Sequence, residues 1–209
     1  MKPDVVVLDY GSGNVRSVVR ALEHVGAAVE LTFDLDRAEA AAGLLVPGVG
    51  NFHACIAGLL AAGGEGVIAR RRTRQAPVLG ICVGMQVLFE GSDEPAATPL
   101  GGLSVWPGSV HRIDAEVVPH MGWTPVAAGA GSALLEGLDG ERFYFVHSYA
   151  ATDVAALCAA PGPPVVTTAE HGHPFVAAVE DGPLSATQFH PEKSGDAGLH
   201  LLKNWVSSL

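Results

Sequence analysis

The sequence has 209 residues, of which 48% are hydrophobic, so we expect one domain spanning residues 1–209 with an ordinary packed core. The formal net charge of −10 would repel a phosphate backbone, which argues against nucleic acid as a partner. Three cysteines without a CxxC pair support neither a disulfide framework nor a zinc ribbon, and no apolar run reaches the length of a signal-peptide core or a membrane span, so we expect a cytoplasmic protein with no membrane partner.

The first half of the chain alternates between strand and helix signals. Residues 4–11 predict a buried strand, because a Val-rich run without alternation is typical of a strand covered on both faces. Residues 14–26 then carry apolar side chains at helical spacing. Further strands are predicted at 28–32, 43–48 and 76–81, and further helices at 34–42, 52–64, 65–75 and 83–91. This alternation indicates a parallel sheet with right-handed crossovers and helices on both faces.

The second half of the chain carries short strand signals and few helix signals. A loop rich in Pro and Gly is predicted at 91–103, and a helix at 196–209 closes the chain. Between them lie short strand-like segments at 109–113, 116–123, 141–149, 165–172, 175–182 and 184–190. These segments favour antiparallel or mixed pairing. The predicted fold class is therefore α/β, with an open, mixed but mostly parallel sheet.

Four segments that follow predicted strands carry residues of chemical interest. They lie at 9–14, 47–51, 82–86 and 190–192. Ligands of open α/β sheets bind outside the carboxyl ends of the strands, so we expect all four segments at one edge of the sheet. The first, DYGSGN, opens a helix as a dinucleotide-binding segment does, but it lacks the third glycine of that motif.

The segment GICVGMQ, residues 80–86, predicts a nucleophile elbow. Gly80 and Gly84 permit a sharp strand-to-helix turn that lifts the sulfur of Cys82 toward the sheet edge. A helix N-terminus favours the thiolate, which is the reactive form, and the N–H of Val83 is placed to donate to an oxyanion. The alternative is a buried structural cysteine with packing glycines, and the spacing alone leaves both interpretations open.

The segment FHPEKS, residues 189–194, offers the base that such a nucleophile needs. His190 can exchange a proton with the thiol, and Glu192 can turn back across Pro191 to fix the tautomer of the imidazole. The motif HGH at 171–173 has no third ligand at recognisable spacing, so we interpret it as a turn and expect no metal site. The remaining histidines lack such a neighbourhood, and we expect them at surface or packing positions: His24, His53, His111, His120, His147, His171, His173 and His200.

The segment VPGVGNF, residues 46–52, places Gly48 and Gly50 on a loop at the same sheet edge. Backbone N–H groups of such a loop can approach an anion or a carbonyl oxygen. The segment is too short for a phosphate-binding P-loop and lacks the Lys-Ser/Thr ending. We therefore expect it to contact a ligand through its backbone.

The motifs PGVG, GICVGMQ and FHPE, in that order along the whole chain, resemble the class I glutamine amidotransferases. The segments DYGSGNVRSV, PHMGW, FYFVHSY and HPEKS resemble most closely the members that supply ammonia for histidine biosynthesis. The resemblance implies a flavodoxin-like sheet, L-glutamine as substrate, no cofactor, and a cyclase subunit that receives the ammonia.

The resemblance also implies a role for individual residues. Cys82 attacks the side-chain amide of glutamine, His190 gives its proton to the departing ammonia, and Glu192 orients His190. N–H groups of Gly48, Val49, Gly50 and Val83 stabilise the oxyanion, and Gln86, Ser148 and Tyr149 hold the glutamine. The residues implied to face the cyclase are Asn14, Met121, Trp123 and Lys193.

Several alternatives and one hypothesis stay open at this point. The glutaminase that serves pyridoxal phosphate synthesis shares the elbow and the His-Glu pair but usually has GGES where this chain has VPGVGNF. A cysteine peptidase or esterase and a non-enzymatic binding module are the other classes. Val49 lies between two glycines and resists unusual backbone angles, so we hypothesise that the oxyanion hole is misformed until the partner binds.

Overall fold

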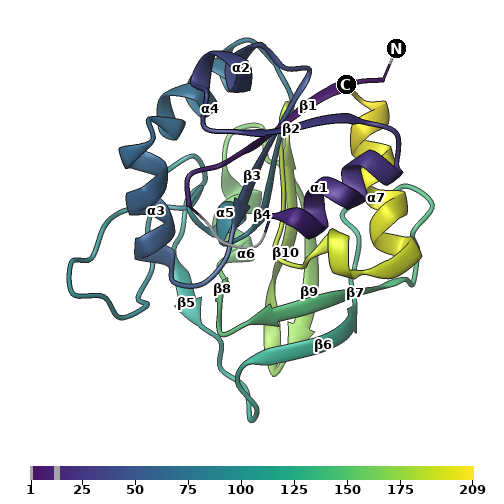
Figure 1. Ribbon diagram of the computed structural model, residues 1–209. Coiled ribbons are helices and arrows are strands. Elements are labelled where there is room, and N and C mark those ends of the chain that lie inside the picture. The colour runs from purple at the N-terminus through teal and green to yellow at the C-terminus, as the bar shows by residue number, and fades with distance from the viewer. Residues whose placement is uncertain (1, 12–14) are drawn as a thin grey trace.

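The computed structural model describes residues 2–11 and 15–209, and within these a seven-stranded sheet forms the centre of the molecule (Figure 1). The strands lie in the order β2-β1-β3-β4-β11-β10-β9. The first five are parallel to one another: β2 (Ala28–Thr32), β1 (Asp4–Leu8), β3 (Gly43–Gly48), β4 (Val78–Cys82) and β11 (Leu184–Thr187). The other two, β10 (His173–Asp181) and β9 (Val165–His171), pair antiparallel. The predicted open, mostly parallel sheet is confirmed.

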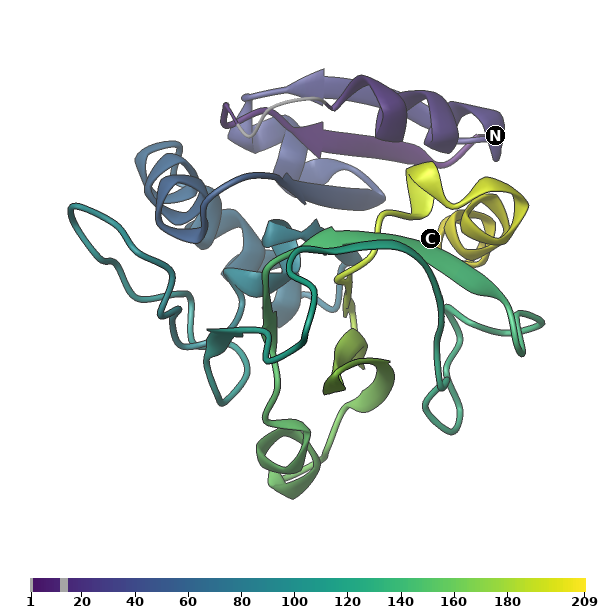
Figure 2. The ribbon, with the colours of Figure 1, turned by 90° about the horizontal axis from the view of Figure 1, so that it is seen from below.

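Helices cover both faces of this sheet (Figures 1 and 2). On one side α1 (Arg16–His24) packs beside α7 (Gly195–Ser207), and on the other lie α2 (Leu35–Ala40), α3 (Phe52–Ala61) and α4 (Gly64–Thr73). All residues of β3 and β4 are buried, as the runs without alternation predict for central strands. In the described part of the chain no single helix has the length and composition of a membrane span, and α3 meets that test only together with α4, across a bend of 79°.

Smaller elements lie at the lower end of the molecule in Figure 1. There, β5 (Val110–Arg112) pairs with β8 (Tyr149–Ala151), and β6 (His120–Pro125) pairs with β7 (Arg142–His147), both antiparallel. The short helices are α5 (Val83–Gln86), α6 (Val154–Ala159) and the 3-10 helix η1 (Pro191–Lys193). Because η1 follows β11 and α5 follows β4, both short helices begin at the edge where the parallel strands end.

The expectation that four loop segments share one sheet edge agrees with this topology. Segments 47–51, 82–86 and 190–192 follow β3, β4 and β11, which are parallel neighbours. Asp9 follows β1 of the same parallel set. Residues 12–14 of the first segment, and with them Asn14, lie outside the described residues.

One predicted helix is shorter than expected, and one helix was missed. The predicted helix at 83–91 ends at Gln86, because the carbonyls of Val87, Leu88 and Phe89, which would continue it, accept hydrogen bonds from the N–H groups of residues 103–106. Helix α6 was not predicted, although the side chain of Asp153 caps its first turn by accepting from the N–H of Ala156. The length of α5 depends on hydrogen bonds from a segment distant in sequence, which the local pattern does not reveal. Helix α6 was missed because Asp153 was not recognised as a capping residue.

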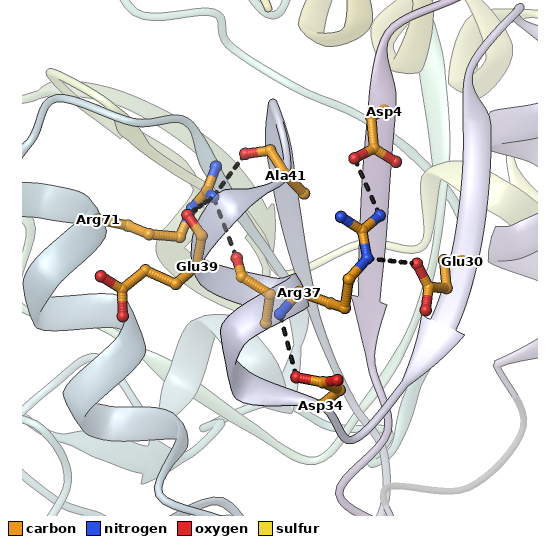
Figure 3. Close-up of polar contacts among 8 residues, drawn as sticks. Asp4, Glu30, Asp34, Arg37, Glu39, Ala41 and Arg71 are labelled. Atoms are coloured by element: carbon orange, nitrogen blue, oxygen red, sulfur yellow. Dashed lines mark hydrogen bonds and ion pairs between the residues drawn. The ribbon is translucent and has the colours of Figure 1, made fainter.

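The basic patch RRRTR at the end of α4 contains a buried arginine whose role the sequence did not predict. Arg71 is 0% exposed. Its guanidinium donates to the carbonyls of Ala38, Glu39 and Ala41 at 3.1, 3.0 and 2.7 Å, and to those of Ala42 and Pro77 at 2.9 and 2.8 Å. Ala38 and Glu39 lie in the last turn of α2, where carbonyls have no partner within the helix, and Ala41 and Ala42 directly follow it; Figure 3 shows Arg71 beside Glu39 and Ala41. Arg71 therefore joins α4, the end of α2 and the start of the central strands.

Helix α2 is also fixed at the sheet by a half-exposed arginine. Arg37 pairs with Glu30 of β2 at 2.9 Å and with Asp4 of β1 at 3.2 Å, and Asp34 caps the helix by accepting from the N–H groups of residues 36 and 37 (Figure 3). Because these groups are partly solvated and screened by water, each pair contributes little to stability. The buried Arg71 is the stronger constraint on this corner of the fold.

We predict that Arg71→Met lowers the free energy of unfolding by about 3–5 kcal/mol, because it leaves buried carbonyls without a donor. The matched control is Arg72→Met in the same helix turn, whose side chain is 46% exposed and lies 3.6 Å from Asp181, and it should cost at most about 1 kcal/mol. Urea unfolding of both variants measures the difference. Equal losses in the two variants would contradict this role for Arg71.

Candidate active site

Cys82 lies at a strained turn between β4 and α5. Its φ is +56° and its ψ is −114°, a backbone conformation that residues other than glycine rarely adopt. The neighbouring glycines are needed for close packing: a Cβ on Gly84 would lie 2.1 Å from the carbonyl oxygen of Val46, and one on Gly80 would lie 2.7 Å from that of Gly84. The turn therefore has the geometry of a nucleophile elbow, with the strain on the cysteine itself.

His190 and Glu192 form a buried pair beside this turn. The Nδ1 of His190 lies 2.8 Å from Oε1 of Glu192, with side chains only 4% and 8% exposed. A carboxylate can only accept, so Nδ1 carries the proton and Nε2 is left for another partner. Cys82 and His190 line the same pocket, and the Cys82 side chain is one of the groups that raise the pKa of His190. Cysteine, imidazole and carboxylate thus lie together at this edge of the sheet.

The environment of His190 stabilises the imidazolium. Burial lowers its pKa, but hydrogen bonds and charge interactions with Cys82 and Glu192 outweigh the burial and raise the pKa from 6.5 to about 9. The backbone is also held, because the N–H of His190 donates to Tyr144 at 3.0 Å and its carbonyl accepts from the hydroxyl of Ser194 at 2.6 Å. The imidazole is therefore fixed in place beside the thiol.

A pocket of about 350 Å³ opens over the thiol. The predicted site residues that line it are Val49, Gly50, Cys82, Val83, Gln86, Ser148, Tyr149, His190 and Lys193. Gly48 lies beneath the pocket instead, where a Cβ would come within 2.2 Å of the backbone nitrogen of Gly84. Glu192 lies behind His190.

The loop at 47–50 is fixed by two donors. The hydroxyl of Tyr10 donates to the carbonyl of Pro47, and the thiol of Cys55 donates to the carbonyl of Val49 at 3.1 Å. Burial raises the pKa of the Cys55 thiol to about 11, so that thiol remains a protonated donor. Cys55 is buried in α3, and Cys158 is exposed in α6.

Sequence reasoning missed four residues of this region. Glu94, Val146 and His147 line the pocket, and Gln188 is buried against Cys82, with its Nε2 3.7 Å from Sγ. His147 falls among the histidines expected at surface or packing positions, yet it lies in the pocket wall. Gln188 carried one usable signal, because it is a polar residue within a predicted strand-like segment, two positions before His190.

The residues implied to face a partner lie at the surface, apart from Asn14, which is not described. On β6, Met121 is 66% exposed and Trp123 is 50% exposed, both large apolar side chains in contact with solvent. Lys193 is exposed at the rim of the pocket. Exposed apolar side chains beside a pocket are typical of an interaction surface.

The structure gives no support for a metal centre. Among residues 2–11 and 15–209, no group of three or more His, Cys, Asp or Glu side chains is arranged to hold a metal ion. The HGH motif is a turn, as expected: Gly172 has φ +75° between β9 and β10. His171 stacks on His120 with ring centroids 4.2 Å apart.

The family model of the class I glutamine amidotransferases matches residues 6–209. The chain belongs to this family. Among solved structures, a glutamine amidotransferase shares the fold of this amidotransferase with a TM-score of 0.73 at 21% identity, covering 98% of this chain and 99% of that one.

Sequence relatives narrow the position of this amidotransferase within the family. It is 58% identical over its full length to the imidazole glycerol phosphate synthase subunit HisH of Leifsonia xyli, with 100% of both chains covered. It is 59% identical to the HisH subunit of Mycobacterium leprae, with 98% of both chains covered. This amidotransferase is therefore homologous over its whole length to HisH, a glutaminase subunit of histidine biosynthesis.

We predict a pH-dependent stability from the raised pKa of His190. The pKa of about 9 in the folded chain exceeds the value of 6.5 in an unfolded chain, so protonation of His190 stabilises the fold fully below pH 6.5, and this contribution is lost as the pH rises through 9. Glu192→Gln removes the negative partner of His190. The decrease in the free energy of unfolding between pH 6.5 and pH 9 should therefore be smaller in this variant than in the wild type. Urea unfolding at a series of pH values measures it.

The control for this prediction is Glu141→Gln, at an exposed position before β7. It should retain the pH dependence of the wild type. Titration of the His190 ring by NMR should show a midpoint near pH 9 in the wild type and a lower midpoint in Glu192→Gln. Identical midpoints in the two would contradict the assignment.

Proposed function

We propose that this amidotransferase hydrolyses glutamine to glutamate and ammonia, with Cys82, His190 and Glu192 as the catalytic triad. The observation that carries the proposal is the series of contacts from a thiol on a strained elbow, through a buried imidazole, to a carboxylate 2.8 Å from it. A structural cysteine requires neither the strained φ nor the paired imidazole. Together these features favour a nucleophile.

The proposed reaction proceeds in two halves. The thiolate of Cys82 attacks the side-chain amide carbon, His190 protonates the leaving nitrogen, and the C–N bond breaks to release ammonia and leave a thioester. Water, deprotonated by His190, then attacks the thioester, and glutamate leaves as the thiol regains its proton. Glu192 holds the imidazole in one tautomer through both halves.

Two sets of backbone and side-chain groups support binding of the substrate. The N–H groups of Val83, at the start of α5, and of Val49 and Gly50 line the pocket where an oxyanion would form, and each such donor is worth about 3–4 kcal/mol in the transition state. Glu94, in the pocket wall, offers a negative charge to the α-ammonium group of glutamine. Gln86, Ser148 and Tyr149 line the remainder of the pocket.

We further propose that the ammonia passes to the cyclase subunit HisF in a heterodimer, which makes imidazole glycerol phosphate and AICAR from PRFAR. Support comes from the HisH relatives, which are subunits of imidazole glycerol phosphate synthase. Met121 and Trp123 are exposed on β6, where Met121 pairs with the pocket residue Val146, and Lys193 lies at the pocket rim. Together they offer a docking surface near the site of ammonia release. The three free thiols fit a reducing cytoplasm.

The chemistry is tested by ammonia release from glutamine, for the chain alone and mixed with the cyclase and its nucleotide ligand. We expect activity in the mixture, none with Cys82→Ala, and a loss of about three orders of magnitude or more with His190→Gln. Cys158→Ala, at an exposed cysteine outside the pocket, should keep the wild-type rate. Ammonia release that persists in Cys82→Ala would disprove the nucleophile.

The same assay tests the hypothesis about Val49. If partner binding completes the oxyanion hole, the isolated chain should release ammonia more slowly than the complex with cyclase and nucleotide ligand. Equal rates would end that hypothesis and leave the triad unaffected.

The docking surface is tested by binding to the cyclase. Trp123→Ala should weaken the complex by about 2 kcal/mol, or roughly thirtyfold in Kd, if the indole is buried at the interface. The control is Leu60→Ala. Leu60 is also an exposed apolar residue, but it lies near the C-terminal end of α3 and outside the proposed docking surface, so its removal should leave the Kd unchanged. Calorimetric titration measures both, and an unchanged Kd for Trp123→Ala would place the interface elsewhere.

A further inference from the structure

The sulfur of Cys82 has a second polar neighbour that the triad does not include. Nε2 of Gln188 lies 3.7 Å from Sγ, and the side chain of Gln188 is 0% exposed. Gln188 stands two residues before His190, just after the end of β11. Its amide is therefore fixed in the buried layer beneath the thiol.

The direction of this amide follows from one backbone atom. The carbonyl of Tyr149 can only accept, so the atom of Gln86 that lies 2.8 Å from it must be the NH₂ nitrogen. That nitrogen lies 2.9 Å from the side chain of Gln188, whose facing atom must then be the oxygen. The other end of the Gln188 amide, which faces Sγ, is consequently the NH₂ donor.

The carbonyl of Tyr149 also fixes a chain of donors on its other side. It lies 3.0 Å from Nδ1 of His147, so that nitrogen carries a proton and Nε2 of His147 accepts from Nδ1 of His120, 3.0 Å away. Nε2 of His120 then accepts from the hydroxyl of Thr124 at 2.7 Å. All donors in this chain point toward the Tyr149 carbonyl.

Both histidines are neutral near pH 7, which this arrangement requires. Burial lowers the pKa of His147 to about 3 and that of His120 to about 4. Each ring therefore has one donor and one acceptor nitrogen. The Tyr149 carbonyl accepts from both sides and has no freedom to turn away from Gln86.

We propose, on the basis of the proposed function, that Gln188 is a further catalytic residue: its amide N–H donates to Sγ of Cys82 and favours the thiolate, while Gln86 and the Tyr149 carbonyl hold the amide in that orientation. An N–H donor binds a neutral thiol weakly, whereas its hydrogen bond to a thiolate is charge-assisted and about twice as strong. The difference shifts the equilibrium toward the nucleophilic form.

Other groups around the thiol act on the same equilibrium and must be held constant in a test. His190 approaches from the end of β11, and Cys55 lies on α3. Glu94 and Lys193 line the same pocket. The test therefore changes Gln188 alone.

The test is the pH dependence of alkylation of Cys82 by iodoacetamide, followed by mass spectrometry of the peptide that contains Cys82. Gln188→Met keeps the length of the side chain and removes the donor, and we expect the midpoint of alkylation to rise by about one pH unit, a roughly tenfold slower reaction below the midpoint. Gln188→Glu places a carboxylate beside the sulfur and should raise the midpoint further.

The control is Gln75→Met, at an exposed glutamine whose side chain bonds only to the carbonyl of Arg72 among the described residues. It should retain the wild-type midpoint. A midpoint unchanged in Gln188→Met would overturn the proposal. Alkylation needs no glutamine, so a chain that shows the shift but releases no ammonia even when mixed with the cyclase and its nucleotide ligand would disprove the proposed function and not the donor.

A measurement on the wild-type chain decides the question if the variants do not fold. In a chain labelled with ¹⁵N-glutamine, the side-chain amide signal of Gln188 should move with the midpoint of Cys82 alkylation, and it should not move in Cys82→Ala. The signal of Gln75 serves as reference. A Gln188 signal that is unaffected by ionisation of the thiol would overturn the proposal.

Discussion

Strand β11 returns from the far end of the chain and pairs in parallel with β4, with Thr187 opposite Ile81. This register brings the end of β11 beside the end of β4, so Gln188 and His190 meet Cys82 although more than a hundred residues separate them in sequence. Side chains alternate between the faces of a strand, and a slip of one residue would turn Gln188 away from the sulfur. Both the triad and the additional donor depend on this register.

The strain at Cys82 is held by rigid neighbours. The elbow fits only because Gly48, Gly80 and Gly84 let backbones approach more closely than a Cβ would allow. Behind it, β3 and β4 are buried at all positions, so the elbow cannot relax by moving the strands. Arg71 secures the opposite end of the same strands by binding carbonyls near their start. The strained turn and its support thus lie at opposite ends of one pair of strands.

The sequence predicts those parts of the molecule that local pattern determines. Runs without alternation identified β1, β3 and β4, and residues at strand ends identified Cys82 and His190, because a parallel sheet places such residues at one edge. The early end of α5 and the burial of Arg71 depend on segments distant in sequence. Gln188 and His147 were missed for the same reason, since their partners are set by tertiary pairing and not by neighbours in the chain.

The network that orients Gln188 converges on a main-chain oxygen, that of Tyr149. A substitution of the tyrosine side chain leaves this oxygen in place, so the network should tolerate sequence drift at position 149 provided the strand β8 keeps its path. Drift at positions 86, 147 and 188 removes a donor or an acceptor. Among relatives, the side chain at position 149 should therefore vary, whereas the residues at positions 86, 147 and 188 should stay the same.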